Sequence, residues 1–482
     1  MSALSVRDVL DSTGAVLVRG ELGREIAGVS TDTRSLRPRE LFLALSGPNF
    51  DGNAFAAQAC RGGAGALLLR GEPGGPAPVP DLPVGDLPGD APVALHRSPR
   101  LALADLAAWH RSRLAAPVIG VTGSCGKTTT KEILRQLLES RLRTVASPSS
   151  FNNDVGVPLT LLSAERSTEV LVVEMGTNAP GEIAALCKVA RPTAGIITNV
   201  GASHLEGLGS LDGVAREKSE LFASLPAGGF AVLNLDSRYA PLLRRSTRAR
   251  LITVSIEGGG EFDATQPWFH SGGTTFALRG HEVTSPLLGL HNVSNLLCAL
   301  AACHGLGIPL EEVLPAVTRL RGGRRRMERI DIGDLLVFDD TYNANPESAR
   351  AAVRVLAGLH AGGGRRVLAL GDMLELGPSA PELHHALGRE AAERGIDLLL
   401  LVGELTRATA AGALEAGMAP ERVVHLGSAE EAIESLPPHL AGGDVVLFKA
   451  SRRLGLERVV ERLVAQRAPM HAPRLTARLG AG

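Results

Sequence analysis

Short apolar runs alternate with stretches of helical spacing over the middle of the chain. Each run is rich in Val, Ile or Leu, and each is separated from the next by a segment that suits a helix. This alternation predicts an α/β fold, in which a parallel sheet has helices on both faces. The expected buried strands are 117–121, 170–174, 195–199 and 231–235, and the expected helices are 101–114 and 127 to about 140.

Two further regions with similar alternation flank this segment. The N-terminal region has apolar runs at 15–18, 40–45, 65–69 and 92–95. Its stretch 72–92 is dense in Pro and Gly, and we interpret it as a loop within that region because an apolar run follows it directly. The C-terminal region follows the arginine-rich cluster 321–326. Its expected strands are 335–338, 366–370, 397–402 and 444–448.

The pattern therefore predicts three α/β domains, at 1–97, 98–322 and 323–482. Residues 251–290 contain brief apolar runs and many Gly residues, which favours a small antiparallel addition. The tail from about 469 is expected to be mobile. A length of 482 residues agrees with several domains, because single domains usually run to about 100–200 residues.

Charge and cysteine content argue against several functional classes. Lys and Arg number 50 and Asp and Glu number 51, so the formal net charge of −1 argues against a nucleic-acid partner. The five cysteines are scattered without C-x-x-C spacing, as in a reduced compartment. No apolar run approaches the roughly 20 residues that cross a bilayer, and the first residues do not resemble a signal peptide. We expect a cytoplasmic protein without membrane insertion.

A glycine-rich turn joins the expected strand 117–121 to a helix that begins at Lys127. Glycines allow backbone N–H groups to turn toward an anion, and the helix N-terminus adds positive potential. A lysine and a hydroxyl at the helix start suit the oxygens of a polyphosphate and a bound Mg²⁺. We call this turn the phosphate loop, and it consists of Gly123, Ser124, Cys125, Gly126, Lys127 and Thr128.

Two alternatives accompany the phosphate loop. Val121 stands where the strict phosphate-binding pattern has its first Gly, so a Gly-rich turn with a chance Lys is the competing explanation. Cys125 could be a reactive thiol at a helix N-terminus, but a small filling side chain is the simpler role.

Polar residues follow two of the neighbouring strands. Glu174 closes an apolar run at the carboxyl edge where doubly wound sheets bind ligands, so it suits a Mg²⁺ ligand. Its alternative is a helix cap or a solvated loop acid. His204 follows the next strand and can be a metal ligand, a phosphate-orienting group or a structural histidine. Together with Thr128, these two residues favour a metal site.

Three other stretches are less specific. The charged residues around Lys218 suit a solvated helix face. Asn292 opens an Ala-rich helix, and it could contact a base edge or cap that helix. Residues 339–346 follow a buried strand and carry many side-chain donors and acceptors, which indicates a ligand loop, although Asn-Pro turns are common.

These ordered motifs resemble the Mur ligases, which add amino acids to the peptidoglycan precursor. The similarity spans nearly the whole chain, including the strand end that carries His204, and its motifs are 120–132, 152–158, 174–176, 291–292 and 339–346. It implies a three-domain architecture. A UDP-substrate domain and a Rossmann-like C-terminal domain would flank a central domain that binds ATP through the phosphate loop.

By this resemblance, ATP and Mg²⁺ are the cofactors. Lys127, His204 and Lys218 are the implied catalytic residues, and Lys218 stands at a position that the family often carbamylates. The implied metal ligands are Thr128, Glu174 and His204. The implied ATP contacts are Gly123, Ser124, Cys125, Gly126, Lys127, Thr128, Thr129, Asn292, Arg326 and Asp340, and the implied substrate contacts are Ser30, Asp32, Arg34, Asn152 and Asn153.

Within the family, residues 339–346 and 371–377 are similar to members that join D-alanyl-D-alanine to UDP-N-acetylmuramoyl-tripeptide through an acyl phosphate. The resemblance implies that the partners are these small molecules and that the protein is a monomer. A related ligase with a different acceptor and a non-catalytic nucleotide-binding protein are the alternatives. The chain departs from the family pattern at three places. Asn53 stands in place of His, Ala450 stands in place of Gly, and residues 324–326 are three consecutive arginines.

Overall fold

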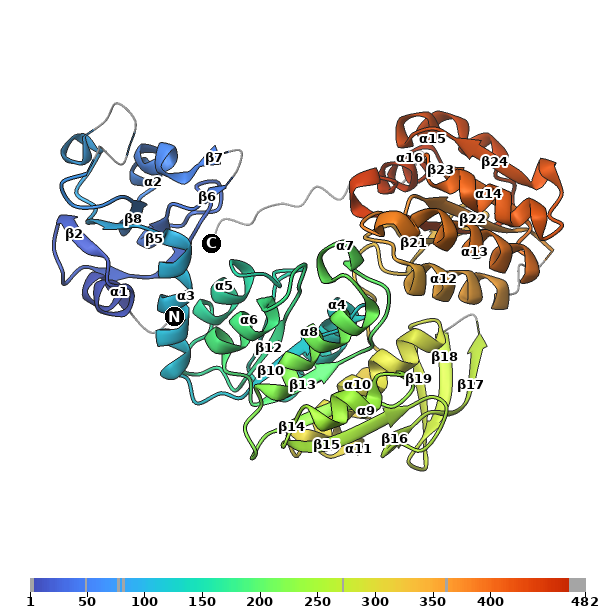
Figure 1. Ribbon diagram of the computed structural model, residues 1–482, viewed down its shortest axis with the longest axis horizontal. Coiled ribbons are helices and arrows are strands. Elements are labelled where there is room, and N and C mark those ends of the chain that lie inside the picture. Colours follow the sequence, from blue (N-terminus) through green and yellow to red (C-terminus); the bar gives the residue numbers. More distant parts are fainter. Residues whose placement is uncertain are drawn as a thin grey trace. The chain divides into compact units, whose positions relative to one another are not determined.

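The computed structural model describes residues 4–47, 50–75, 79, 83–270, 273–359 and 363–467. The tail that the sequence predicts to be mobile lies outside these residues. The chain forms two compact units: Met1–Val200 with Ser210–Asp263 and Ser294–Ala316, and Gly201–Gly209 with Ala264–Val293 and Val317–Gly482. Each unit contains strands and helices in alternation, so the predicted α/β class is confirmed (Figure 1). The domain boundaries at 97 and 322 stay predictions.

A five-stranded sheet forms the N-terminal part of the first unit. Its strand order is β2-β9-β8-β5-β4, and only β2 pairs antiparallel. Strands β8 and β9 are neighbours, so the Pro- and Gly-rich stretch connects two strands of one sheet. The bounds are β1 Leu4–Ser5, α1 Val6–Thr13, β2 Val16–Arg19, β3 Glu25–Ile26, β4 Gly28–Ser30, β5 Glu40–Leu43, β6 Ser46–Gly47, β7 Phe50–Asp51, α2 Ala56–Arg61, β8 Ala66–Arg70 and β9 Val93–His96.

The central sheet of the first unit has seven parallel strands in the order β11-β12-β10-β13-β14-β15-β16. The four predicted strands and two predicted helices are all present, with small shifts at their ends. The bounds are α3 Pro99–Ser112, β10 Val118–Thr122, α4 Lys127–Glu139, β11 Thr144–Ala146, α5 Gly156–Leu162, β12 Val170–Glu174, α6 Glu182–Ala190, β13 Ala194–Ile197, α8 Leu211–Ala223, β14 Phe230–Asn234, α9 Ala240–Arg245, β15 Arg250–Ser255 and β16 Phe262–Asp263.

The last two strands of this sheet correct one prediction. The sequence favours an antiparallel addition over 251–290, but β15 and β16 extend the parallel sheet. The prediction rests on short apolar runs and many Gly residues, and neither feature distinguishes the direction in which a strand pairs. Among the described residues of 251–290, the antiparallel strands are β17 Thr265–His270, β18 Gly273–Leu278 and β19 His281–Ser285, in the second unit.

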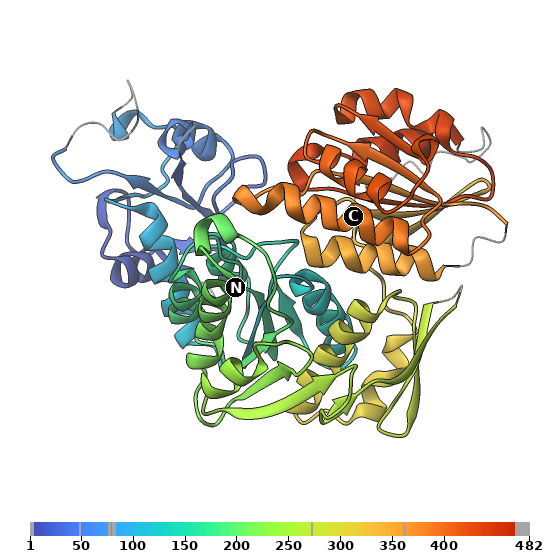
Figure 2. The same ribbon diagram turned by 45° about the vertical axis from the view of Figure 1, so that its right-hand side comes forward.

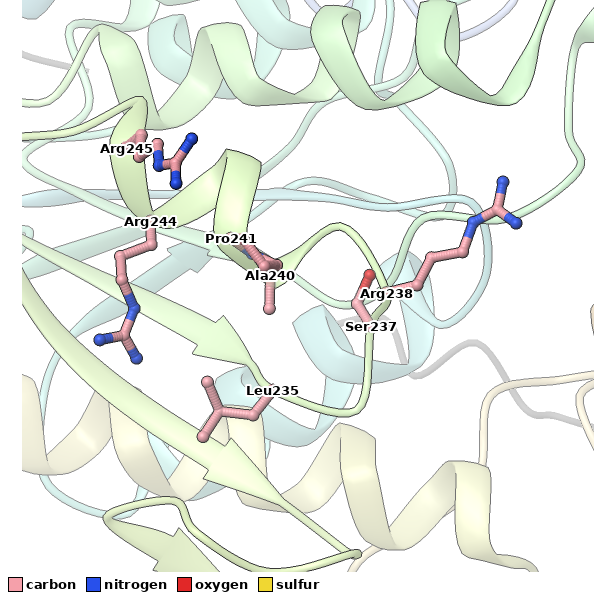
Figure 3. A pocket seen from close by; sticks show the side chains of 7 residues that line it. All are labelled: Leu235, Ser237, Arg238, Ala240, Pro241, Arg244 and Arg245. Carbon is pink, nitrogen blue, oxygen red and sulfur yellow. The ribbon is translucent and has the colours of Figure 1, made fainter.

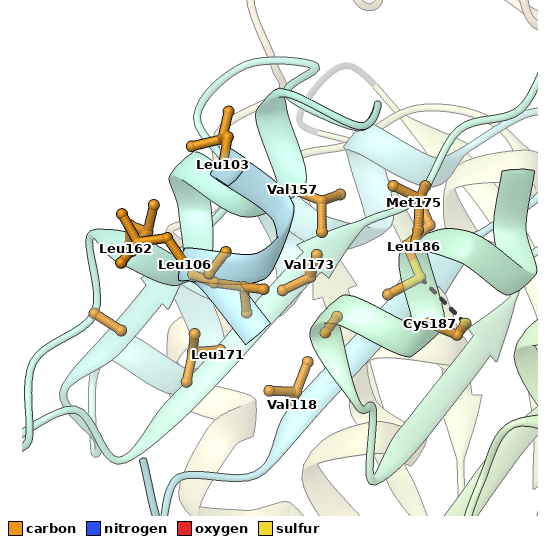
Figure 4. Close-up of a cluster of buried hydrophobic side chains, with 14 of the residues drawn as sticks. Leu103, Leu106, Val118, Val157, Leu162, Leu171, Val173, Met175, Leu186 and Cys187 are labelled. Atoms are coloured by element: carbon orange, nitrogen blue, oxygen red, sulfur yellow. Dashed lines mark hydrogen bonds between the residues drawn. The ribbon is translucent and has the colours of Figure 1, made fainter. Parts of the chain in front are cut away.

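An apolar core lies between the central sheet and helices α3, α5 and α6. Leu103 of α3, Val157 of α5, and Leu171 and Val173 of β12 belong to the same buried cluster (Figure 4). Each fully buried aliphatic side chain stabilises the fold by ~1.5–3 kcal/mol relative to exposure. This packing fixes the sheet whose carboxyl edge carries the phosphate loop.

A mixed six-stranded sheet forms the main part of the second unit. Its order is β20-β21-β25-β22-β23-β24, and only β20 is antiparallel. Helices α12, α13 and α14 contribute to the apolar cluster on one face, and α15 and α16 to that on the other (Figures 1 and 2). The sequence does not predict β24, because its residues 423–425 are only partly buried at the sheet edge.

The remaining bounds complete the description. The helices and strands are α7 Leu205–Leu208, α10 Leu290–Gly305, α11 Leu310–Val317, β20 Glu328–Ile332, β21 Leu335–Asp340, α12 Pro346–Gly358, β22 Arg366–Gly371, α13 Ala380–Glu393, β23 Leu398–Val402, α14 Thr406–Glu415, β24 Val423–Leu426, α15 Ala429–Ser435, β25 Val445–Lys449 and α16 Glu457–Arg467. The 3-10 turns are Gly52–Phe55, Val84–Asp86, Gly377–Ser379, Pro420–Arg422, Pro437–His439 and Arg452–Leu454. Over the described ranges, no helix has the length and apolarity that a bilayer crossing requires.

Two glycines allow α13 and α14 to approach each other closely. A Cβ at Gly388 would lie 1.9 Å from the carbonyl oxygen of Thr409, and one at Gly412 would lie 2.0 Å from that of His385. Gly388→Ala is therefore expected to lower the free energy of unfolding by ~1–3 kcal/mol, because the helices must separate. Urea unfolding followed by circular dichroism measures this change. Gly358→Ala, where a Cβ meets nothing within 4 Å, is the control, and equal unfolding midpoints for the two variants would contradict the prediction.

Candidate functional site

The phosphate loop connects β10 to α4 through backbone that favours glycine at two positions. Gly123 has a φ of +151° and Gly126 has a φ of +83°. A Cβ at Gly123 would lie 1.9 Å from Oγ1 of Thr198, and one at Gly126 would lie 2.2 Å from Oδ1 of Asn295. Both glycines are thus required by backbone conformation and by close packing. The strand, glycine loop and helix follow each other as the sequence predicts.

Two residues after β13 hold the phosphate loop in place. The backbone N–H of Cys125 donates to Oδ1 of Asn199 at 2.8 Å, and the Thr198 hydroxyl donates to the carbonyl oxygen of Cys125 at 2.5 Å. Nζ of Lys127 donates to the carbonyl oxygen of Gly123 at 2.8 Å, so this side chain folds over the loop. Neither Thr198 nor Asn199 is among the predicted site residues, although both follow a strand at its carboxyl edge.

Glu174 ends β12 and is only 1% exposed, which excludes the solvated-acid alternative. Its Oε1 accepts a hydrogen bond from Nδ2 of Asn152 at 2.9 Å, whereas Oε2 is buried without a partner among the described residues. Oγ1 of Thr122, at the end of β10, is another of the five buried side-chain oxygens that lack a hydrogen-bond partner among the described residues. Buried oxygens without partners are costly unless a ligand completes them. With the buried Thr128, this oxygen-rich edge fits Mg²⁺.

The composition of this edge also agrees with magnesium rather than with a metal held by protein alone. Within the described ranges, no group of three or more His, Cys, Asp or Glu side chains is arranged to hold a metal ion. Mg²⁺ commonly takes one or two carboxylates and completes its coordination with water and substrate phosphates. A single buried carboxylate beside a phosphate loop meets that requirement.

Lys218 lies in α8, and the solvated-face explanation is wrong for it because the residue is only 1% exposed. Burial, together with the nearby Lys127 cation, holds the pKa of Lys218 well below its ordinary value. The adjacent Glu217 is buried too, and its carboxylate accepts hydrogen bonds from the backbone N–H groups of Gly181 at 2.7 Å and Ile183 at 2.8 Å. Burial thus favours the uncharged form of the Lys218 amine, which lies near the phosphate-loop lysine.

Asn152 and Asn153 follow β11 and have different contacts. Asn152 binds Glu174, as described above. Oδ1 of Asn153 accepts hydrogen bonds from the backbone N–H groups of Val155 at 3.2 Å and Gly156 at 2.9 Å, at the start of α5. Both amides thus have partners within the chain, and their contact with substrate stays a prediction.

Three predicted substrate residues cluster at the end of β4. The Ser30 hydroxyl donates to the carbonyl oxygen of Asp32 at 3.0 Å, and Asp32 pairs with Arg34 at 2.6 Å. Hydrogen bonds from Arg34 lower the pKa of Asp32 to about 2. The Arg34 side chain is 85% exposed, so it is accessible to an anion. Asn53, which replaces the family's usual His, bonds both backbone groups of Arg70, at 2.8 Å and 3.0 Å.

In the second unit, Asp340 ends β21 and pairs with the buried Lys449. The distance from Nζ of Lys449 to Oδ2 of Asp340 is 2.5 Å, and Nζ also donates to the carbonyl oxygen of Asn343 at 3.1 Å. Ala450 follows directly, and a Cβ at Gly371 would lie 2.7 Å from the Cβ of Ala450. The additional methyl group of Ala450 therefore fits because a glycine stands opposite it.

The structure distinguishes two of the consecutive arginines before β20. Arg325 forms ion pairs with Glu457 at 3.1 Å and with Glu461 at 2.8 Å. The guanidinium of Arg326 instead lies 4.0 Å from the ring centroid of Tyr342, in the predicted ligand loop. Arg325 is thus engaged by two carboxylates and Arg326 by an aromatic ring, and the choice of the functional arginine stays a prediction.

His204 and Asn292 also belong to the second unit. His204 has a φ of +51° and precedes the short helix α7, and its Nδ1 lies 3.2 Å from Oε2 of Glu375. Nδ2 of Asn292 donates to the carbonyl oxygen of Leu288 at 2.8 Å. His204 thus makes a structural contact of the kind considered as an alternative, whereas the bond of Asn292 is a donor contact and not a helix cap. Their ligand roles stay predictions.

The predicted site residues accordingly fall into three groups. The first surrounds the phosphate loop and comprises the loop itself with Thr129, Asn152, Asn153, Glu174 and Lys218. The second lies at β4 and comprises Ser30, Asp32 and Arg34. The third belongs to the second unit and comprises His204, Asn292, Arg326 and Asp340.

A separate hollow of about 500 Å³ opens beside α9, away from all of these groups in sequence. Its lining residues are Leu235, Ser237, Arg238, Ala240, Pro241, Arg244 and Arg245. Arg238 extends away from Arg244 and Arg245, so the guanidinium groups do not converge on one point (Figure 3). The hollow therefore has no arrangement that indicates a ligand.

Comparison with known proteins agrees with this geometry. Residues 121–303 match the Mur ligase middle domain, and residues 325–452 match the Mur ligase, glutamate ligase domain. The UDP-N-acetylmuramoyl-tripeptide–D-alanyl-D-alanine ligase of Bacillus subtilis (strain 168) is 35% identical over 460 residues, which are 93% of this chain and 97% of that protein.

Solved structures give the same result. MurF from Acinetobacter baumannii superimposes with a TM-score of 0.85 at 30% identity, covering 96% of this chain and 99% of that one. The MurF ligase from Thermotoga maritima in complex with ADP has a TM-score of 0.77 at 27% identity, covering 91% and 97%.

The lowered pKa of the buried Lys218 predicts a particular dependence of stability on pH. The pKa in the folded state lies well below the unfolded value of about 10.4, so only the unfolded chain binds this proton between the two values. Stability therefore rises with pH across that window. Lys218→Met is expected to raise the free energy of unfolding at pH 7, and this gain should shrink by up to about 1.4 kcal/mol per pH unit toward pH 9.

Urea unfolding of the wild type and of Lys218→Met at pH 7 and pH 9 measures this difference. Lys188→Met is the matched control, because Lys188 is exposed on α6 and should show no such trend. A difference between the wild type and Lys218→Met that is the same at both pH values would show that Lys218 keeps its proton when folded.

Proposed function

The chain belongs to the Mur ligase family, and on that premise we propose that it joins D-alanyl-D-alanine to UDP-N-acetylmuramoyl-tripeptide. ATP is consumed, and the products are UDP-N-acetylmuramoyl-pentapeptide, ADP and phosphate, in peptidoglycan synthesis. The observation that carries this function is the 35% identity over 93% of the chain to a ligase named for this reaction. The phosphate loop and the buried Glu174 support its ATP-dependent step.

The reaction requires activation because a carboxylate is a poor acyl donor at neutral pH. The tripeptide carboxylate attacks the γ-phosphorus of ATP, the bond to ADP breaks, and an acyl phosphate forms. The amine of D-alanyl-D-alanine then attacks the acyl carbon, an amide bond forms, and phosphate leaves. The chain contributes mainly by positioning the reactants and by neutralising charge.

The phosphate loop binds the nucleotide in this proposal. Backbone N–H groups at the start of α4 contact phosphate oxygens, and Lys127 exchanges its bond to the carbonyl of Gly123 for a bond to them. When bound, Mg²⁺ neutralises charge on the phosphoryl group that is transferred. Thr128 and Oε2 of Glu174 would hold that ion, and the lack of another partner for Oε2 in the described chain supports this.

Lys218 is proposed to carry a carbamate that serves as a further metal ligand. A carbamate forms when a neutral amine attacks CO₂, an N–C bond is made and the nitrogen releases one proton to water; the lowered pKa of Lys218 raises the fraction of that neutral amine. The product is an anion, and the nearby Lys127 cation favours it. The resemblance to the family and the burial of Lys218 both support this assignment.

The remaining site residues keep the roles that the family resemblance implies. His204 is proposed as a ligand of a second Mg²⁺, Asn292 as the adenine contact, and Arg326 and Asp340 as ATP contacts. The contact of Arg326 with the Tyr342 ring and the ion pair of Asp340 with Lys449 support the two proposed ATP contacts, because each interaction holds a charged group in a defined position.

The proposal assigns the uridine-diphosphate end of the substrate to the cluster at β4. Ser30, Asp32 and Arg34 contact it there, and the exposed guanidinium of Arg34 supports an anionic ligand. Asn152 and Asn153 lie near the peptide-bearing end. The enzyme is further proposed to be a cytoplasmic monomer with domains at 1–97, 98–322 and 323–482, and the five free cysteines agree with a reduced compartment.

Release of ADP with defined substrates tests the proposed function. Purified protein with ATP, Mg²⁺ and UDP-N-acetylmuramoyl-tripeptide is expected to release ADP steadily only when D-alanyl-D-alanine is added. Lys127→Ala should reduce this release to background, because the phosphate-contacting cation is lost, and its circular dichroism spectrum should match the wild type.

The outcomes of this experiment separate the alternatives. Full turnover by Lys127→Ala would refute the role of the phosphate loop. Faster turnover with a shorter muramyl peptide or a different amine acceptor would indicate a related ligase. ADP release that stays at background with every acceptor would indicate a non-catalytic nucleotide-binding protein.

Chemical rescue tests the carbamate at Lys218. Lys218→Ala is expected to lower the rate of ADP release by at least about tenfold, since loss of a metal-site group commonly costs 10–100-fold. Added acetate or formate should restore part of the rate by supplying a carboxylate in the space that the side chain leaves. The same additions to Lys188→Ala, whose side chain is exposed, should have no effect. A Lys218→Ala enzyme with the wild-type rate would end the proposal.

A further inference from the structure

A buried lysine beyond the phosphate loop ties α4 to the segment that follows β11. Lys131 lies one helical turn after Lys127, and its side chain is 0% exposed. Its Nζ donates to the carbonyl oxygens of Ser147 at 2.7 Å and Ser149 at 2.8 Å. Nζ also lies 2.7 Å from Oε1 of Glu132. Three oxygen partners match the three hydrogens of an ammonium group.

Packing alone does not account for a lysine at this position. Removal of an ammonium group from water costs several kcal/mol, and its partners must compensate for that cost. A methionine of similar length would fill the same space without that desolvation cost. The presence of Lys131 therefore indicates that its hydrogen bonds serve a purpose.

The two carbonyl groups belong to the segment 147–153, which forms no helix or strand. Ser149 has a φ of +46°, a left-handed conformation that costs a residue with a side chain ~1–2 kcal/mol. The hydrogen bond from Lys131 to the carbonyl oxygen of Ser149 offsets this cost. Lys131 thus selects one path of the segment.

Both ends of this segment contact Glu174. At its start, Oγ of Ser147 accepts a hydrogen bond from the backbone N–H of Glu174 at 3.0 Å. Near its end, Asn152 donates to Oε1 of Glu174 at 2.9 Å, and its carbonyl oxygen accepts from the N–H of Gly176 at 2.8 Å. One carboxylate oxygen is thereby engaged, and the other is the buried oxygen without a partner in the described chain.

We propose that Lys131 is a positioning residue that orients the Glu174 carboxylate for a divalent cation through the segment 147–153. Lys131 touches neither nucleotide nor metal in this arrangement. Its effect passes from Nζ to the carbonyl groups of Ser147 and Ser149, and from Asn152 to Oε1. The inference rests on the proposed function for the identity of the ion, Mg²⁺, and extends it to a group outside the phosphate loop.

Hydrogen exchange and Mn²⁺ binding test this role without measuring turnover. In nucleotide-free Lys131→Met, the backbone amides of 147–153 are expected to exchange at least about tenfold faster than in the wild type. With ADP present, the dissociation constant for Mn²⁺, measured by electron paramagnetic resonance, is expected to rise about 10–100-fold, as for other residues that orient a metal ligand. Lys188→Met is the matched control and should change neither quantity.

A second variant separates the two steps of the argument. Asn152→Ala removes only the last contact, so it should weaken Mn²⁺ binding similarly while the amides of 147–149 exchange as in the wild type. A merely structural lysine would change stability and exchange but leave the Mn²⁺ dissociation constant unaltered.

The possible results decide the proposal in either direction. Unchanged exchange in Lys131→Met overturns the tie to the segment, and unchanged Mn²⁺ affinity overturns the link to Glu174. If Lys131→Met fails to fold, Asn152→Ala decides the question, since wild-type Mn²⁺ affinity in that variant would overturn the proposal. Acceptor-dependent ADP release by the wild type is measured in parallel. Its absence would refute the proposed function, and the exchange and Mn²⁺ results would still decide the role of Lys131.

Discussion

The phosphate loop packs against its neighbours at distances that leave no space for a side chain at Gly123 or Gly126. Thr198 stands against the first glycine and Asn295 against the second, and these come from the end of β13 and from α10. Three segments far apart in sequence must therefore assemble before the loop's N–H groups can face a common point. Catalysis by preorganised dipoles depends on such an arrangement, because the groups need not reorganise during the reaction.

The sequence predicts the parts of this arrangement that depend on local pattern. Apolar runs predict β10 and β12, and the glycine spacing predicts the turn between strand and helix. The pattern fails where burial is partial, as at β24, and it does not distinguish the direction in which a strand pairs, as at β15. It also cannot show which side chains support the loop: Thr198 and Asn199 act through contacts with residues more than seventy positions away. The burial of Lys218 is not predictable from the sequence either, because the residues next to it are charged.

Two buried lysines illustrate how surroundings decide what an amine can do. Lys131 is surrounded by three oxygen atoms, which stabilise an ammonium group. Burial depresses the pKa of Lys218, and the nearby Lys127 cation adds to this effect, so the surroundings favour the neutral form of its amine. One residue is therefore suited to holding a segment in place and the other to covalent chemistry. The difference arises from neighbours and not from residue type.

The distribution of lysines also matters for handling the protein. Only five of its 50 basic residues are lysines, and Lys131, Lys218 and Lys449 are buried while Lys127 is half-buried on the phosphate loop. Arginine supplies nearly all the exposed positive charge, and it does not react with active esters because it stays protonated. Among the lysine side chains, Lys188 is therefore the one most open to amine-reactive reagents, and the buried lysines near the phosphate loop are shielded from them.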